Sequence, residues 1–495
     1  MPIPQYQKPV KFQIEAPRAL HPIIKGTLTT LFRSVEFDSG RRISIISHDL
    51  AQGIFTAVKL EGSDYVWKYL DQEINSLCYN RNDREKRVKE RIRLGITRVI
   101  CLEYQIPFSP WGILVGVRPT KLVHRLIDRS FSLEQIKHIL SDVYHVSPAR
   151  QKLLIDVVLK QRDFFLSDVN NPISIYVGIP FCPTRCDYCS FAAYPLKTHG
   201  HLLPQFLQAL KKELISLGKM LQELEVKVQS VYIGGGTPTT IRGEDLALLL
   251  MILNKYFSAN ECQEYTIEAG RPETITADIL RMFKDNGVQR ICINPQTMND
   301  HTLRLIGRAH TAHHIREAFA LTRKAGIPII NSDLILGLPG EDVNDFEYSL
   351  VELAKLRPDN ITIHSLALKR ASIFGQTPSE LDIQQHQGKK MALLAKNYME
   401  ELGFEPYYLY RQRYTLGDLE NIGYGRRGTE SIYNIQMMEE RQTIIGIGGG
   451  AMTKLVNNDL SLVRQANPKC PATYSNQIEQ IIAAKKYQIR QHLSV

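Results

Sequence analysis

Three cysteines in one short stretch offer the chemistry around which this chain is organised. Cys182, Cys186 and Cys189 lie in Tyr176-Val-Gly-Ile-Pro-Phe-Cys-Pro-Thr-Arg-Cys-Asp-Tyr-Cys189, after a β-branched run typical of a strand. A C-x3-C-x2-C loop can wrap a compact inorganic cluster, and three thiolates leave one iron of a [4Fe–4S] cube without a protein ligand. We therefore expect a cluster with one iron open to chemistry.

Two simpler explanations compete with the cluster. A structural zinc site usually closes with four ligands from paired knuckles, but the sequence offers no second cysteine pair and no nearby histidine to complete the set. Three buried thiols could also occur by chance, although their grouping within eight residues argues against this. The cluster is the stronger hypothesis.

The length and composition describe a folded protein of several domains. The 495 residues predict two or three domains, and 43% of them are hydrophobic. We expect no signal peptide, and because no run of about 18 apolar residues occurs we expect no membrane span. The eight cysteines follow no disulfide spacing, which favours the reducing cytoplasm.

A basic domain is expected over residues 1–170. It holds 26 lysines and arginines against 18 acidic residues, which accounts for most of the net charge of +10. Strand-like runs near residues 42–46 and 53–58 precede a helical pattern from Tyr65, then a mixed-charge helix over 81–93. This predicts an α+β domain whose charge could meet nucleic acid, an anionic small molecule or only solvent.

Six strand–helix repeats follow over residues 171–370, which predicts a parallel sheet with helices outside. The pattern fits either a partial barrel or a doubly wound sheet, and in both the ligands lie beyond the carboxyl ends of the strands. The third segment, 371–495, alternates tyrosine with arginine over Phe404–Tyr414 and has a glycine-rich loop at 446–450. It could form a lid over a flat anionic substrate or an ordinary edge strand.

Several polar or glycine positions fall where these strands end. The turn Gly234-Gly-Gly-Thr237 would let the backbone approach a ligand closely, although tight turns use the same residues. A carboxylate inside an apolar strand, as at Asp333, is costly without partners. Each position alone would also suit a satisfied polar group of the core. The candidates are Gly235, Gly236, Thr237, Glu268, Gln296, Arg308 and Asp333.

The cysteine spacing, with Tyr188 before the last cysteine, resembles the radical S-adenosylmethionine (SAM) family. The resemblance implies a partial (β/α)6 barrel in which SAM chelates the open iron and is split to a 5′-deoxyadenosyl radical. It implies one SAM on the cluster, with a second SAM as an alternative stoichiometry. By motif it places SAM contacts at Tyr176, Tyr188, Gly235, Gly236, Thr237, Glu268, Gln296, Arg308, Asp333, Ala367 and Met452, the last in a loop.

Within that family, Tyr-x-x-Ile-Pro-Phe-Cys, Gly-Gly-Gly-Thr-Pro-Thr and Leu336-Gly-Leu-Pro-Gly340 resemble the oxygen-independent coproporphyrinogen III oxidases (coproporphyrinogen dehydrogenases). The long N-terminal domain resembles their HemZ type. The resemblance covers residues 171–455 and implies an oxidoreductase of haem and porphyrin biosynthesis. It would convert coproporphyrinogen III to protoporphyrinogen IX, using an electron donor such as flavodoxin or ferredoxin.

One position departs from this family. The oxidases carry a further cysteine two residues past the third, whereas this chain has Phe191, like the related haem chaperones. A haem chaperone of the same fold is therefore one alternative. A radical SAM enzyme acting on nucleic acid is another, but the basic segment 81–93 has no aromatic residues for stacking bases, so we do not expect nucleic acid.

Overall fold

The computed structural model describes residues 9–32, 34–72, 81–114, 116–189, 192–366, 378–412 and 419–493. The chain forms two compact units, Met1–Asp156 and Val157–Val495, and the division falls within helix α6 (Pro148–Arg162). The sequence predicted a boundary near residue 170 and a third domain from residue 371. In the structure, strands from beyond residue 371 belong to the same sheet as the predicted core.

The first unit is a five-stranded sheet with packed helices, in the strand order β2-β1-β3-β4-β5. Helix α3 packs on β4 and on α1. A Cβ at Gly95 would lie 2.4 Å from the Trp67 ring, so only glycine lets α3 approach the sheet this closely. The elements are β1 (Val10–Glu15), α1 (His21–Leu31), β2 (Val35–Phe37), β3 (Arg41–Leu50), β4 (Gly53–Leu60), β5 (Val66–Asp71), α3 (Arg81–Glu103), α4 (Thr120–Asp128) and α5 (Leu133–His138).

The predicted helix from Tyr65 is wrong at its start, because residues 66–71 form strand β5. Pairing with β4 buries Trp67 and places the Asp71 carboxylate 2.7 Å from Arg87 Nε of α3. An apolar spacing that suits a helix was here overridden by strand pairing and a buried ion pair. Residues 73–80, which also carried the helical pattern, lie outside the described part of the chain.

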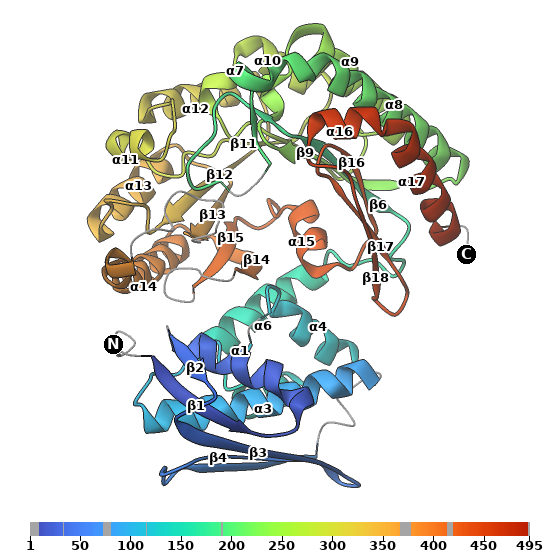
Figure 1. The fold of residues 1–495 in the computed structure, drawn as a ribbon. Helices are drawn as coiled ribbons and strands as arrows, with labels where there is room; N and C mark the ends of the chain where they lie inside the picture. Colours follow the sequence, from blue (N-terminus) through green and yellow to red (C-terminus); the bar gives the residue numbers. More distant parts are fainter. Residues whose placement is uncertain are drawn as a thin grey trace. The chain divides into compact units, whose positions relative to one another are not determined.

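The second unit is built on six parallel strands that lie side by side in chain order. Sequential order without reversal is the arrangement of a barrel and not of a doubly wound sheet. The predicted partial (β/α)6 barrel is therefore confirmed, and Figure 1 shows its curved sheet with the helices along the outside. The strands are β6 (Ile173–Ile179), β9 (Val228–Gly235), β10 (Glu264–Glu268), β11 (Arg290–Cys292), β12 (Ile329–Leu336) and β13 (Asn360–Ser365).

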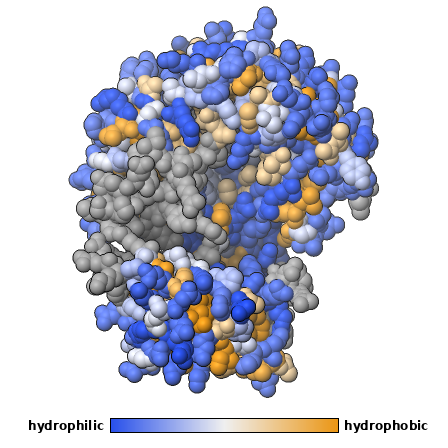
Figure 2. Space-filling model, viewed as in Figure 1, coloured by the Kyte–Doolittle hydropathy of each residue, from blue (hydrophilic) through white to orange (hydrophobic). Residues whose placement is uncertain are grey.

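The outer helices follow from the amphipathic pattern of the sequence. In α10, for example, Ile279, Leu280 and Phe283 are buried, while the polar face meets solvent. Figure 2 shows mostly hydrophilic residues over this outer layer. The helices are α8 (Leu203–Glu223), α9 (Gly243–Phe257), α10 (Ala277–Asp285), α11 (Asp300–Leu305), α12 (Ala312–Ala325), α13 (Val343–Lys355) and α14 (Pro378–Glu401).

The C-terminal chain extends both edges of the parallel sheet. On one side β15 (Glu420–Gly425) pairs antiparallel with β13, and β14 (Glu405–Arg411) pairs with β15. On the other side β16 (Ile444–Gly448) lies parallel to β6, followed by β17 (Met452–Val456) and β18 (Leu462–Ala466). Helices α15 (Ile432–Glu439), α16 (Pro471–Asn476) and α17 (Ile478–Leu493) complete the unit, and α16 and α17 pack on α8.

A buried carboxylate joins these C-terminal helices to the sheet. Glu213 of α8 is fully buried and accepts hydrogen bonds from the Gly448 N–H at 2.8 Å and the Tyr474 hydroxyl at 2.6 Å. Lys485 of α17, also fully buried, places its Nζ 2.6 Å from the same carboxylate. Asn467 Nδ2 adds a further donor at 3.1 Å. Residues from four C-terminal positions thus converge on one side chain of the barrel layer.

Candidate functional site

The loop that carries the three cysteines follows β6 and is pinned by a short strand pair, β7 (Phe181–Cys182) with β8 (Tyr194–Pro195). Within it the Cys189 N–H donates to the Cys186 carbonyl at 3.1 Å. Burial raises the pKa of the Cys182 thiol to about 11, and the neighbouring thiols of Cys186 and Cys189 add to the rise. A bound cation would reverse this effect. The three predicted thiols lie on one loop, where the charges of Cys186 and Cys189 act on Cys182.

Two features describe the surroundings of the thiols: how the ligand-type side chains are spread, and how much space lies beside Cys182. No three His, Cys, Asp or Glu side chains among the described residues converge as a single metal ion requires. A four-iron cube places each thiolate on a different iron, so the thiolates need not converge. The Thr237 hydroxyl lies 3.5 Å from Cys182 Sγ, and a Cβ at Gly236 would lie 2.9 Å from the same sulfur. Glycine at 236 therefore keeps space open beside the thiolate.

The glycine turn after β9 lies against a carboxylate from the next strand. Glu268, the last residue of β10, accepts from the Gly235 N–H at 3.2 Å and from the Tyr232 hydroxyl at 2.6 Å. Gly235 has φ +112°, and a Cβ at Gly234 would lie 3.0 Å from the carboxyl carbon of Glu268. Burial, aided by the nearby Asp333, raises the pKa of Glu268 to about 7. A cationic or hydroxyl donor that binds beside this carboxylate would stabilise its ionised form.

Arg308 and Tyr188 link the cysteine loop to the strand ends. The Arg308 guanidinium donates to the Tyr188 hydroxyl at 2.6 Å, to the Gly270 carbonyl at 2.7 Å and to the Asn294 carbonyl at 3.2 Å. These acceptors lie past β10 and β11, while Tyr188 lies between the second and third cysteines. The arginine is therefore held in place, with its charge beside the loop.

Gln296 carries a buried amide with unused hydrogen-bonding capacity. Its backbone has φ +69° and bridges to β12, because its N–H donates to the Asp333 carbonyl at 2.9 Å and its carbonyl accepts from Ile335 at 2.9 Å. Its Oε1 atom is buried and has no hydrogen-bond partner among the described residues. A buried acceptor without a partner is costly, so a ligand donor would stabilise it.

Asp333 meets a histidine that the sequence had not singled out. Its carboxylate accepts from Asn331 Nδ2 at 3.1 Å and lies 3.5 Å from Nε2 of His364, on β13. The other ring nitrogen, Nδ1, lies 3.1 Å from the Tyr410 hydroxyl of β14. The half-buried Asp333 thus uses only part of its hydrogen-bonding capacity and keeps some exposed surface, as a carboxylate that faces a ligand would.

Tyr176 lies in a stack of three tyrosines at the interior of the sheet. Its ring is 6.2 Å from that of Tyr232 and 5.9 Å from that of Tyr433, with small interplanar angles. The predicted Met452 begins strand β17 and is not in a loop, which corrects that expectation; its backbone packs on Gly446, the β16 partner of Tyr176. Ala367 lies outside the described residues.

Two groups of side chains join the site without having been predicted. The pair His364 and Tyr410 could have been found only by knowing which strands are neighbours, although the tyrosine belonged to the aromatic run noted in the sequence. Arg271 and His310 follow Glu268 and Arg308 by two or three residues, and their proximity in sequence was the available signal.

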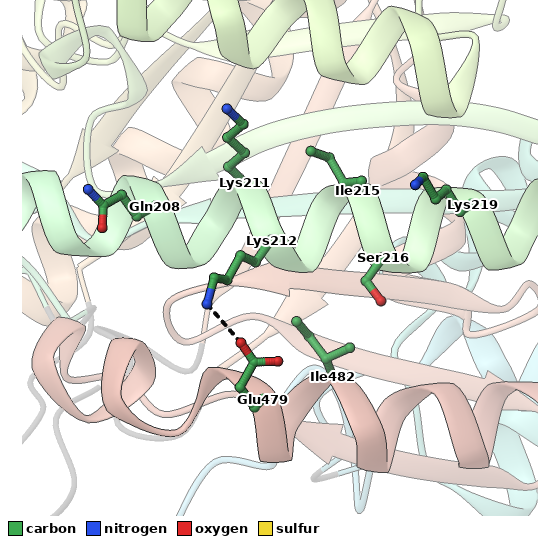
Figure 3. Close-up of a pocket in the computed structure, with 8 residues that line it drawn as sticks. All are labelled: Gln208, Lys211, Lys212, Ile215, Ser216, Lys219, Glu479 and Ile482. Atoms are coloured by element: carbon green, nitrogen blue, oxygen red, sulfur yellow. Dashed lines mark hydrogen bonds and ion pairs between the residues drawn. The ribbon is translucent and has the colours of Figure 1, made fainter.

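A surface groove of about 670 Å³ lies elsewhere, between α8 and α17 (Figure 3). It is lined by Lys211, Lys212 and Lys219 on one helix and by Glu479 and Ile482 on the other, with Lys212 and Glu479 paired at 2.8 Å. None of its lining residues belongs to the cysteine loop or the strand ends. We therefore do not assign cofactor chemistry to it.

Comparison with known sequences finds related proteins. The profile of the Radical SAM superfamily matches residues 176–353. The chain is 42% identical over 374 residues to the oxygen-independent coproporphyrinogen-III oxidase-like protein HemZ of Bacillus subtilis (strain 168), which covers 74% of this chain and 75% of that protein. It is 28% identical to the haem chaperone HemW of the same organism, covering 56% of this chain and 70% of that protein.

Comparison with solved structures supports the fold. The chain is similar to coproporphyrinogen III oxidase (HemN) from Escherichia coli, with a TM-score of 0.50 and 19% sequence identity over 68% of this chain and 82% of that chain. Among the described residues, no helix is both long enough and apolar enough to cross a membrane.

Proposed function

Because this chain belongs to the radical SAM superfamily, and within it to the family of the oxygen-independent coproporphyrinogen-III oxidase-like protein HemZ, we propose that it decarboxylates coproporphyrinogen III oxidatively to protoporphyrinogen IX. Each of two propionate groups would lose a hydrogen atom from its β-carbon to the 5′-deoxyadenosyl radical, then carbon dioxide and one electron, which would pass to a one-electron acceptor, and would become a vinyl group. The observation that carries the proposal is the cysteine loop held against Thr237, Arg271 and Arg308 at the strand ends, in a chain whose 42%-identical relative is named oxidase-like.

The cofactors of the family are a [4Fe–4S] cluster and SAM. When bound, they supply one-electron cleavage of the sulfonium and a 5′-deoxyadenosyl radical. Cys182, Cys186 and Cys189 would hold the cluster and leave one iron for SAM. The protein's remaining task is to bind, orient and exclude water.

The SAM contacts are proposed residue by residue. Glu268 and Asp333 offer acceptors to the ammonium and ribose hydroxyls, and the unused Oε1 of Gln296 offers another. Arg308 offers a fixed positive charge to the carboxylate of SAM. Backbone groups of the glycine turn would meet the methionine end. Tyr176, Tyr188, Gly235, Gly236, Thr237, Ala367 and Met452 complete the proposed set.

Substrate and electron partners are also part of the proposal. The tetracarboxylate porphyrinogen would occupy the barrel interior under the tyrosine-rich strands β14 and β15. A one-electron donor such as flavodoxin or ferredoxin would reduce the cluster. We place the protein in the cytoplasm, because a thiolate-held cluster requires reducing surroundings.

A second candidate is haem delivery without net chemistry. It is supported by the likeness to HemW and by Phe191, which stands where the oxidases have a further cysteine. Such a chaperone would bind haem stoichiometrically and use the same fold.

An anaerobic assay separates the two candidates. Reconstituted protein would be given coproporphyrinogen III, SAM and a reductant, with the Cys186→Ala variant as the control. If the protein is the oxidase, we expect it to form protoporphyrinogen and 5′-deoxyadenosine, and we expect the variant to form neither. Haem bound at one per chain, with no vinyl product from the reconstituted protein, would instead establish the chaperone.

A further inference from the structure

A buried arginine outside the predicted site points at the cysteine loop. Arg271 follows β10 and is 3% exposed. Its Nη1 lies 3.5 Å from the Sγ of Cys186 and 3.3 Å from the Thr184 carbonyl, and its Nη2 donates to the Thr184 hydroxyl at 2.8 Å. The Arg271 guanidinium therefore binds the loop at Thr184, between the first two cysteines, and also donates toward the Cys186 sulfur.

Glu273 binds this arginine on the side away from the loop sulfur, and His310 lies beside Glu273. Glu273, in the 3-10 turn η5 (Pro272–Thr274), accepts from Arg271 Nε at 2.8 Å. The other oxygen of Glu273 lies 3.3 Å from Nδ1 of His310, which is fully buried. Although burial alone would raise it, His310 and Arg271 lower the pKa of Glu273 to about 2, so Glu273 is charged at working pH.

We propose that Arg271 is a positioning residue that raises the reduction potential of the cluster held by Cys182, Cys186 and Cys189, and that Glu273 partly offsets its charge. Reduction adds one negative charge to the cluster. A buried cation that donates to a cluster thiolate stabilises that charge, because hydrogen bonds to the sulfurs and local charge set such potentials. The Glu273 carboxylate, which is paired with Arg271, has the opposite effect and lowers the reduction potential.

The inference goes beyond the proposed function, since it concerns how readily the cluster accepts an electron and not what the radical attacks. It holds equally for an oxidase and for a chaperone that binds the cluster. A purely structural role for Arg271 would secure the loop through Thr184, but it would not predict that two charge changes act with opposite signs.

The test is a potentiometric titration of the anaerobically reconstituted full chain, followed by EPR of the reduced cluster. In Arg271→Gln we expect the ratio of reduced to oxidised cluster at a fixed potential to fall about tenfold, which is 59 mV for a one-electron couple. In Glu273→Gln we expect the ratio to rise, because the cation is no longer offset.

The matched control is Arg290→Gln. Arg290 is also 3% exposed and also donates to backbone carbonyls, those of Thr429 and Glu430, but it lies at the amino end of β11. Its loss should leave the potential unchanged. A wild-type potential in Arg271→Gln with four irons retained would overturn the proposal, as would shifts of the same sign in the 271 and 273 variants.

If Arg271→Gln fails to retain iron, the decision passes to Arg271→Lys and Glu273→Gln. Lysine keeps the charge but not the forked geometry. An unchanged potential in the lysine variant together with a raised one in Glu273→Gln would support the proposal. A fall or no change in Glu273→Gln would overturn it.

Discussion

Two carboxylates on opposite sides of the same sheet, Glu213 fully buried and Glu268 partly buried, have different surroundings. Glu213, on the helical side, accepts from a lysine, a tyrosine, an asparagine and a backbone N–H. Glu268, at the interior strand ends, accepts from Tyr232 and Gly235, and its contacts among the described residues include no cation. The first is satisfied by the protein itself. The second has its pKa raised to about 7 by burial and would gain from a ligand.

The difference separates structural polar groups from ligand-facing ones. Glu213 converges with residues of β16, α16 and α17, so its partners come from the fold. The interior groups around Glu268 have unused capacity: Gln296 Oε1 has no hydrogen-bond partner among the described residues, and Asp333 is half-buried with a histidine at 3.5 Å. Because unsatisfied buried polar groups are costly, such a concentration at one end of a sheet indicates a binding site.

The largest expected effect is a loss of stability when Glu213, the carboxylate satisfied by the protein itself, is removed. Replacing Glu213 with Ala leaves Lys485 buried without its counter-ion, which should cost about 3–5 kcal/mol of unfolding free energy. Urea denaturation measures this loss. The matched interior change, Glu268→Gln, should not lower stability at neutral pH, since burial already disfavours the ionised form of this carboxylate and no cation compensates it.

A second variant guards this test. Replacing both partners, as in Glu213→Leu with Lys485→Met, should recover much of the lost stability, because an apolar pair of similar volume leaves no buried charge. If Glu213→Ala is as stable as the parent, Glu213 is not the structural counterpart of Glu268, and the contrast drawn between the two fails.

A smaller effect probes the ligand-facing side. Asp333→Ala should weaken SAM binding by about 1–3 kcal/mol, or roughly 5- to 150-fold, while iron content stays at that of the parent. Isothermal titration of the cluster-loaded protein measures it, with Asp359→Ala as a carboxylate control, because Asp359 directly precedes β13 at the amino ends of the strands. Equal affinity in a folded, cluster-loaded Asp333 variant would make Asp333 a structural carboxylate like Glu213.

Much of this site was predictable because its signals are local. The cysteine spacing and the glycine turn each lie within a few residues, and each strand–helix repeat shows in its own apolar pattern. The saturation of Glu213 was not predictable, since its partners come from residues 448, 467, 474 and 485. Long-range convergence of this kind leaves no pattern in the sequence around residue 213.

The errors have the same origin. Strand β5 was taken for the start of a helix because its apolar spacing fits both, and pairing with β4 decided the outcome. Met452 was placed in a loop, whereas β17 begins at that residue through pairing with β18. The pair of Asp333 with His364 depends on β12 and β13 being neighbours in register. In each case, pairing between segments set the structure.

The smallest expected effect on SAM affinity concerns pH, and it sharpens the comparison within the site itself. The pKa of Glu268 is raised above that of an unfolded glutamate, so the folded state binds this proton more tightly. The contribution of this group to folding stability should therefore fall as pH rises from about 4.5 to about 7, and then level off.

SAM binding should follow the opposite trend, because the ionised carboxylate is the better acceptor for an ammonium or a hydroxyl. With a pKa near 7, affinity should rise about tenfold between pH 6 and pH 8. Glu268→Gln should flatten this dependence, and Asp333→Ala should lower the affinity without removing it. Titration calorimetry in buffers of different ionisation enthalpy would detect the proton released on binding near pH 6.5. An affinity independent of pH in the parent protein would show that Glu268 does not face SAM, and this carboxylate would then serve another ligand.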